Sequence, residues 1–187
     1  MNGFASLANH FLIAMPALAD PNFARTVTLI CEHSSEGAMG LVVNRLTELH
    51  LRDILDQLDI DASHTPRADL PVYLGGPVQN NRGFVVHEPL GDWESTLPVT
   101  DALGVSTSRD ILEAIARNGG PDQCLIALGY AGWSAGQLER EIRENSWLSV
   151  PASRDILFDL PPEQRWRAAA GLVGVDLNML SGEAGHA

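Results

Sequence analysis

Short apolar runs separated by turn residues dominate the first part of the chain. The runs at 11–15, 26–31 and 39–43 are rich in leucine, isoleucine and valine, as is typical of buried strands. Between the second and third runs, Ser34-Ser35-Glu36-Gly37 is a turn signal. The pattern therefore predicts a strand at 11–15 and a β-hairpin over 26–43.

Helical periodicity follows. Leu51, Ile54, Leu55 and Leu58 recur at i, i+3, i+4 and i+7, which predicts a helix with one apolar stripe. Polar residues and two prolines then predict a long loop over 59–71. Three later helices are expected: one after the N-cap candidates Ser106, Thr107 and Ser108, one over 135–144, and one starting at Pro161-Pro162-Glu163.

Further short strands are expected at 72–74, 84–86, 124–128, 147–150 and 156–158. Strands and helices do not follow a regular strand–helix–strand repeat, which favours the α+β class with a mixed, mainly antiparallel sheet. The length suits one core, and no shift in composition marks a boundary. We therefore expect a single domain over 1–187.

Charge narrows the range of functions. All 12 basic residues are arginine, against 24 acidic residues, so the formal net charge is −12. The absence of lysine excludes a Schiff-base lysine, a P-loop lysine and a Ser-Lys dyad. The acidic balance disfavours direct binding to nucleic acid, because such binding depends on neutralising phosphates.

Two features favour a cytoplasmic protein with no membrane partner. The apolar run at 11–19 is too short to span a bilayer, and no Lys or Arg precedes it as in a signal peptide. Cys31 and Cys124 both lie in apolar runs, which is typical of buried thiols in a reducing compartment.

The segment 129–139 carries the most distinctive chemistry. Within it, Gly132-Trp133-Ser134-Ala135-Gly136 matches the G-x-S-x-G turn that presents a nucleophilic serine. A hydrolase triad needs a later histidine, however, and only His186 follows. Ser134 and Gln137 also fit a capping box, in which the serine oxygen accepts from a helix N–H and the glutamine reaches back. We therefore expect Ser134 to be structural.

Two other chemical candidates are weaker. Cys31 and His33 are two residues apart, so on a regular strand they share one face and a thiol–imidazole pair is open to them. The histidines show no i,i+4 pair and there is no Cys-x-x-Cys motif, so we expect no metal site.

From end to end the chain resembles the small bacterial AlgH/YqgE proteins. The resemblance is carried by stretches at 9–16, 20–23, 31–33, 36–45, 75–78, 82–87, 129–133, 136–139, 145–148, 165–166 and 185–187. It implies a cytosolic, single-domain α+β fold whose branched sheet closes into a pseudo-barrel with flanking helices. It implies no established catalytic residues and no cofactor. The family name implies a role in transcriptional regulation of alginate genes.

These observations favour a non-enzymatic regulatory or binding protein whose partner is an unidentified protein or small ligand. Gly129 and Gly132 each directly precede a large aromatic residue, Tyr130 and Trp133, which predicts a strand end where a ligand can approach. The expected binding surface gathers Asn44, Arg45, Gly75, Gly76, Pro77, His87, Tyr130 and Trp133. The alternatives are a hydrolase using Ser134 or Cys31 as nucleophile and, less favoured, a direct DNA-binding regulator.

Overall fold

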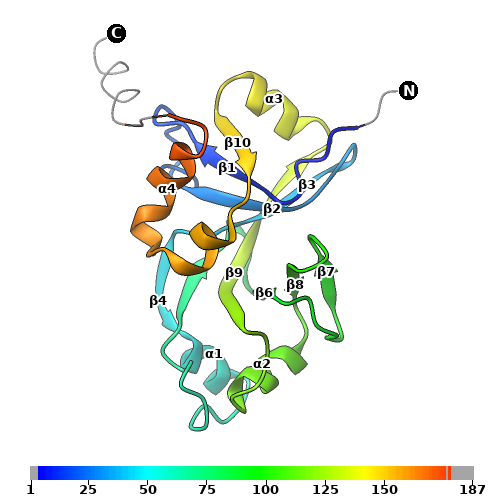
Figure 1. Cartoon of the computed structure of the whole chain (residues 1–187), viewed down its shortest axis with the longest axis vertical. Coiled ribbons are helices and arrows are strands. Elements are labelled where there is room, and N and C mark those ends of the chain that lie inside the picture. The colour runs from blue at the N-terminus through cyan, green and yellow to red at the C-terminus, as the bar shows by residue number, and fades with distance from the viewer. Residues whose placement is uncertain (1–3, 176, 178–187) are drawn as a thin grey trace.

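The computed structural model describes residues 4–175 and 177, and one hydrogen-bonded sheet of ten strands organises them (Figure 1). The strands are β1 (His10–Ala14), β2 (Val27–Ser34), β3 (Gly37–Val42), β4 (Leu46–His50), β5 (Pro71–Leu74), β6 (Val78–Glu88), β7 (Thr96–Pro98), β8 (Gly104–Ser106), β9 (Gln123–Ser134) and β10 (Trp147–Pro151). The helices are α1 (Leu51–Gln57), α2 (Arg109–Ala116), α3 (Gln137–Arg143), α4 (Pro162–Gly171) and the π-helical turn η1 (Asp155–Asp159).

The main path of the sheet runs β10-β1-β2-β3-β9-β6-β8-β7 and curls into a half-barrel (Figure 1). Neighbours along this path are antiparallel. Strand β5, in contrast, pairs with β9 in parallel and carries β4 on its other edge. The predicted α+β class with a mixed, mainly antiparallel, branched sheet and a pseudo-barrel is confirmed.

The branch point is β9, whose first half pairs with β5 and β6 and whose second half pairs with β3. Gly129 divides the two halves with a φ of +78°, a left-handed conformation that favours glycine. Its neighbour across the sheet, Gly76, packs so closely that an added Cβ would lie 2.1 Å from the carbonyl carbon of Tyr130. The sheet can therefore divide here only because glycine stands at these positions.

Three apolar clusters fill the molecule. The largest lies inside the half-barrel and is closed by η1 and α4, with Phe11, Leu41 and Trp166 among its members. A second lies under α1 and α2 at one end, and a third lies under α3 at the other (Figure 1). The helices thus cover the parts of the sheet that the barrel leaves open.

The sequence pattern located most elements, but one strand prediction was wrong. The segment 156–158 forms part of η1, where Leu160 N–H donates to Asp155 O in an i→i+5 bond. Apolar runs this short do not distinguish a strand from a buried helical turn. The structure also contains β4, β7 and β8, which were not predicted, and β6 and β9 are longer than expected.

Candidate functional site

A groove of about 480 Å³ is lined by residues of β2, β3, β6, β7, β8 and β9. Its apolar floor includes Met39, Phe84 and Tyr130. The rings of Phe84 and Tyr130 meet edge to face, with centroids 5.9 Å apart. This surface can receive an aromatic or aliphatic group.

The rim of this groove is polar. Glu32 from β2 and Arg82 from β6 are both exposed and line it together with the hydroxyl groups of Ser95 and Thr107. The Arg82 guanidinium lies over the Phe84 ring, with Cζ 5.4 Å from the centroid. The groove therefore presents one charge of each sign and several hydroxyl groups around an apolar floor. We call this the Tyr130 groove.

Asn44 and Arg45, two of the expected binding residues, hold the loop before β2. Asn44 Oδ1 accepts from Val27 N–H at 2.9 Å, and its Nδ2 donates to Arg25 O at 2.9 Å. Arg45 donates from Nη1 to Pro21 O and Asn22 O at 2.8 Å, and from Nη2 to Ala24 O at 3.0 Å. Their polar groups are thus engaged in fixing the chain.

The remaining expected site residues separate into two regions. Gly75 and Gly76 lie against the backbone of Gly129 and Tyr130, with exposed Pro77 next in the chain. His87, in contrast, pairs with Cys124 at the start of β9, far along the strand from Tyr130. The structure brings the glycine turn and Tyr130 together, and it does not bring His87 to them.

Trp133 is the next-to-last residue of β9, so residues 130–133 form the end of a strand that is longer than the predicted 124–128. The strand continues to Ser134 because β3 pairs with it as far as that residue. Only 6% of Trp133 is exposed, and its Nε1 donates to Glu141 Oε1 at 3.0 Å. Trp147 Nε1 donates to the same oxygen at 3.0 Å. This shared carboxylate ties α3 to two strands.

The geometry around Ser134 corrects the predicted capping box. Helix α3 begins at Gln137 after Gly136, and Ser134 is the last residue of β9. Gln137 does reach back, with Oε1 accepting from Ser134 N–H at 3.0 Å. The serine hydroxyl lies 3.2 Å from the same oxygen and donates to it, so it caps no helix N–H. His186, the later histidine of the triad argument, lies outside the described residues.

Cys31 and His33 do not form a pair, because a β-bulge between Ile30 and Glu32 breaks the alternation of faces. Cys31 packs into the barrel core, and burial raises its pKa to about 12, with Glu32 adding to the shift. A thiol with that pKa is a poor nucleophile at neutral pH.

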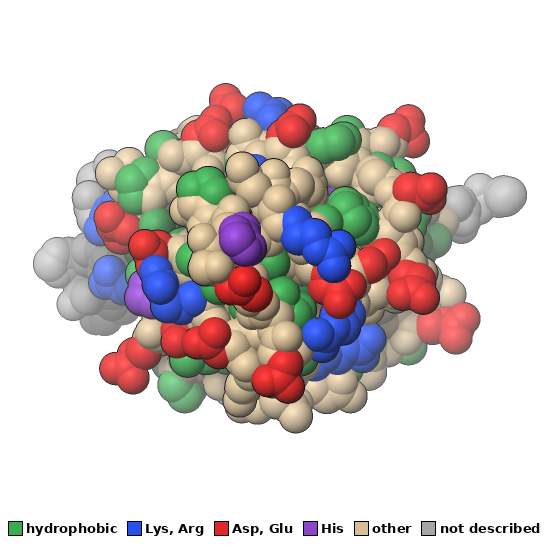
Figure 2. Space-filling view, turned by 90° about the horizontal axis from the view of Figure 1, so that it is seen from below, with side chains coloured by type: hydrophobic (Ala, Val, Ile, Leu, Met, Phe, Trp, Pro, Cys, Tyr) green, Lys and Arg blue, Asp and Glu red, His purple; other side chains and the backbone are tan. Residues whose placement is uncertain are grey.

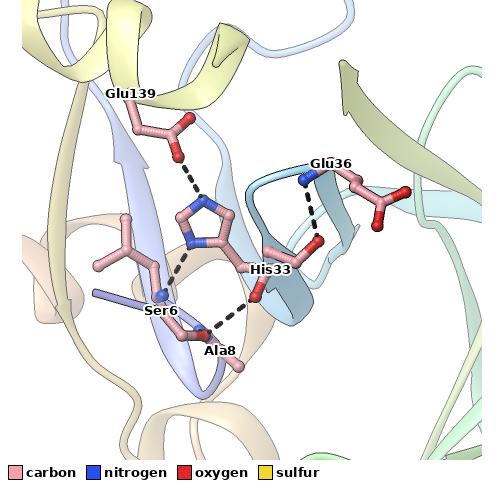
Figure 3. Close-up of polar contacts among 7 residues, drawn as sticks. Ser6, Ala8, His33, Glu36 and Glu139 are labelled. Carbon is pink, nitrogen blue, oxygen red and sulfur yellow. Dashed lines mark hydrogen bonds and ion pairs between the residues drawn. The ribbon is translucent and has the colours of Figure 1, made fainter. Parts of the chain in front are cut away.

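His33 points the other way, toward α3 (Figure 3). Its Nδ1 accepts from Leu7 N–H at 2.9 Å, so its Nε2 carries the proton and donates to Glu139 Oε2 at 3.0 Å. Ser6, in the same N-terminal segment, donates from Oγ to the His33 carbonyl oxygen. Both ring nitrogens are therefore occupied by structural partners.

One serine–histidine pair is present that the sequence did not indicate. His87 Nδ1 donates to Pro89 O at 3.0 Å, so its Nε2 accepts from Ser106 Oγ, 2.7 Å away. Both residues have 0% exposure, and Ser106 Oγ also lies 2.8 Å from Thr96 Oγ1. With no exposed surface, the pair cannot meet a substrate as it stands. Only the pairing of β6 with β8 brings these residues together.

The AlgH-like family model matches residues 11–178. The chain belongs to the AlgH-like family. A UPF0301 protein from Thioalkalivibrio sulfidiphilus is 57% identical over 100% of both chains. A UPF0301 protein from Nitrosococcus oceani is 58% identical over 96% of each chain.

Solved structures agree with this assignment. The solution structure of the AlgH protein from Pseudomonas aeruginosa is 53% identical, covers 100% of both chains and has a TM-score of 0.80. A crystal structure of a protein from Corynebacterium diphtheriae has a TM-score of 0.73 at 19% identity, over 97% of this chain and 94% of that one. The second comparison supports the AlgH-like fold alone.

Two further observations bear on the chemistry of this AlgH-like chain. Within residues 4–175 and 177, no group of three or more His, Cys, Asp or Glu side chains is placed to hold a metal ion. No helix in the same part of the chain is long and apolar enough to cross a membrane.

Proposed function

We propose that this AlgH-like protein acts by binding, as a non-enzymatic regulatory protein, and that the Tyr130 groove receives the bound group. The observation that carries the proposal is the groove itself, with an aromatic floor and a rim holding Arg82, Glu32 and hydroxyl groups. Ligand sites combine such an apolar lining with a few polar groups that set orientation. The occupant is a small ligand or a partner's side chain with an apolar body.

The candidate nucleophiles support catalysis less well than the groove supports binding. Ser134 Oγ donates to Gln137, Cys31 is buried with a raised pKa, and Ser106 is enclosed with His87. A nucleophile needs both an adjacent base and access to substrate. Binding therefore accounts for the described surface better than hydrolysis does.

A regulatory role of the kind implied by the AlgH name would act through this ligand or partner and without direct contact with DNA. The net charge is −12. On the face seen in Figure 2, blue arginine side chains are interspersed among red Asp and Glu and form no continuous basic surface. Duplex binding requires such a surface because it depends on phosphate contacts. The proposal also assumes the reducing setting of the cytoplasm, since Cys31 and Cys124 are free thiols.

The chain offers a specific reporter for the groove because it has two tyrosines, Tyr73 and Tyr130. Protein labelled with 3-fluorotyrosine should give two ¹⁹F resonances, which the Tyr130→Phe variant assigns. We expect N-acetyl-tryptophanamide, a neutral aromatic probe, to shift the Tyr130 signal and leave the Tyr73 signal in place. Tyr130 lines the groove and Tyr73 does not.

Matched variants decide whether the shift reports the groove. Phe84→Ala should weaken probe binding about tenfold by removing one of the aromatic contacts. Leu172→Ala removes an apolar side chain that is 50% exposed on the distant end of α4 and should leave binding unchanged. An unmoved Tyr130 signal at saturating probe, or equal binding by both variants, would refute the proposed site.

A gel-shift series tests the second part of the proposal. Duplex DNA should form no sequence-specific complex at physiological salt with excess competitor. A specific complex of submicromolar affinity would overturn it.

A further inference from the structure

Arg165 is an interior residue of α4, and only 4% of its surface is exposed. Its Nε donates to Leu160 O at 3.1 Å, and its Nη1 donates to Val43 O. The side chain of Tyr73 is a further hydrogen-bond partner of the guanidinium. A buried guanidinium is costly unless its charge is compensated.

The described part of the chain supplies no carboxylate in an ion pair with Arg165. Its nearest compensation is the ring of Tyr73, whose centroid lies 5.1 Å from Cζ in a cation–π contact. Burial lowers the pKa of Arg165, and Tyr73 and the exposed Glu163 only oppose that shift. The charge of the buried guanidinium is thus compensated in part by Tyr73 and Glu163, and by no ion pair among the described residues.

A pocket of about 170 Å³ lies beside this guanidinium, at the start of β5 and β9. Most of its lining is apolar and includes Leu70, Leu157 and Phe158. Arg165 and Cys124 contribute polar groups to the same wall. For scale, a cavity of about 150 Å³ lined by apolar side chains is large enough to hold benzene.

We propose that this pocket binds a small monocarboxylate with an apolar body, and that its carboxylate pairs with Arg165. Arginine has donors left in a fixed planar arrangement that matches the two oxygens of a carboxylate. The apolar lining provides for the rest of such a molecule, up to about the size of one aromatic ring. The bound anion would supply a countercharge that no ion pair within residues 4–175 and 177 supplies.

The composition of the pocket favours a monoanion over phosphate. Arg165 is the one charged residue among the lining residues, and six of the nine are apolar (Leu70, Pro71, Leu125, Ile126, Leu157 and Phe158). A phosphate dianion needs more charged donors than one guanidinium provides. Arg67 donates to Pro121 O and Asp122 O, and its Nη1 lies 3.6 Å from Cys124 Sγ. These contacts hold Arg67 at the edge of the pocket.

The unmodified protein tests the proposal through two readouts. With 3-fluorotyrosine labelling, benzoate should shift the Tyr73 signal, since Tyr73 lines this pocket. Bound benzoate should also slow the reaction of Cys124 with a thiol reagent, because that half-buried thiol lines the same pocket. Neutral benzamide, with the same ring, should bind about tenfold more weakly because it lacks the charge.

Two substitutions that remove the same charge distinguish direct binding by Arg165 from a general effect of the protein's net charge. Arg165→Gln should weaken benzoate binding about tenfold or more and should remove the preference over benzamide. Arg167→Gln alters an exposed arginine on the same helix and should change binding by less than about twofold. Because Arg165→Gln also removes two backbone contacts, a second variant, Cys124→Leu, fills the pocket and leaves Arg165 in place. It should also abolish binding.

Equal binding of benzoate and benzamide, or no effect of benzoate on either Tyr73 or Cys124, would overturn the proposal. The result of these benzoate experiments does not depend on whether the Tyr130 groove binds a ligand. A benzoate response at Tyr73 without a response of Tyr130 to N-acetyl-tryptophanamide would support this pocket and refute the proposed function. A response at Tyr130 without a benzoate response at Tyr73 would support the proposed function and refute this pocket.

Discussion

The imidazole of His33 and the carboxylate of Glu139 lie 3.0 Å apart and join β2 to α3 across 106 residues of sequence. The histidine side chain is 1% exposed and the glutamate side chain 32%. Because His33 Nδ1 accepts from Leu7 N–H, this arrangement requires a neutral imidazole with its proton on Nε2. The N-terminal segment, β2 and α3 are therefore held by one ring in one protonation state.

Acid should weaken this connection. The pKa of Glu139 lies below its ordinary value of 4.5, chiefly through the hydrogen bond from its own backbone N–H and also through the hydrogen bond from His33. A lowered folded-state pKa gives stability that is present above about pH 4.5 and is lost as the pH falls through the folded value. Urea unfolding over this range should show Glu139→Gln to be less pH-dependent than the parent protein. Glu144→Gln, an exposed carboxylate at the end of the same helix, should retain the parent slope.

A second pH dependence should come from His87. Burial lowers its pKa below the ordinary 6.5, against an opposing hydrogen bond to Pro89 O. The unfolded chain therefore binds the proton first, and stability should fall as the pH drops below about 6.5 and through the lowered folded-state pKa. His87→Gln should flatten this part of the profile, whereas His64→Gln should not, because the His64 side chain is 74% exposed. An unchanged slope in His87→Gln would contradict the prediction.

Ser106 should contribute to the stability of the fold through its hydrogen bond to His87 and should affect no activity. Ser106→Ala leaves His87 Nε2 buried without its donor, which should cost about 1–3 kcal/mol in the free energy of unfolding. Denaturant titration at pH 8 measures this cost. Thr96→Val, which removes a hydroxyl one step further from the imidazole, should cost less. If Ser106→Ala instead proved as stable as the parent, the buried pair would contribute nothing to the fold.

The local pattern of apolar and polar residues was enough to predict the elements that bury one apolar face or are joined by a short turn. The stripe from Leu51 to Leu58 gave α1, and the turn at 34–37 gave the β2–β3 hairpin, because each signal is complete within a short segment. Strand β4 has four of its five residues exposed, so it has no clear apolar alternation to indicate it. The bulge at Cys31 likewise reverses the faces of β2, and no residue type in 30–32 indicates a bulge.

The candidate site was harder to predict because tertiary pairing assembles it. The Tyr130 groove takes Glu32, Arg82 and Tyr130 from β2, β6 and β9, of which β6 pairs with β9 directly and β2 is joined to it through β3. Of these, Tyr130 alone was a candidate from sequence, since Gly129 and Gly132 made its segment unusual. The burial of Arg165 could not be predicted from its neighbours in sequence, because it depends on Val43 and Tyr73, more than 90 positions away in the chain.

Ser134 and Gln137 should differ in their effect on stability. Ser134→Ala removes one exposed hydroxyl and should change the free energy of unfolding by less than about 0.5 kcal/mol. Gln137→Ala removes the acceptor for Ser134 N–H and the donor to Glu141 Oε2, so it should cost about 1 kcal/mol or more. Denaturant titration of both variants compares them. A fluorophosphonate probe should label neither the parent protein nor the variants, and stoichiometric labelling at Ser134 would restore the hydrolase alternative.

Substitutions of Trp133 should distinguish clearly between a structural and a functional role for this residue. The indole is 6% exposed, packs edge to face against Trp147 at 6.1 Å between centroids and donates to Glu141. Trp133→Ala should therefore cost about 3–5 kcal/mol, as expected for a large core aromatic. Trp133→Phe keeps most of the volume and loses the hydrogen bond, so it should cost about 1–3 kcal/mol. Because Trp133 does not line the Tyr130 groove, the Phe variant should bind N-acetyl-tryptophanamide with unchanged affinity. A loss below about 1 kcal/mol in Trp133→Ala, together with weaker probe binding by Trp133→Phe, would show instead that this indole belongs to the binding surface.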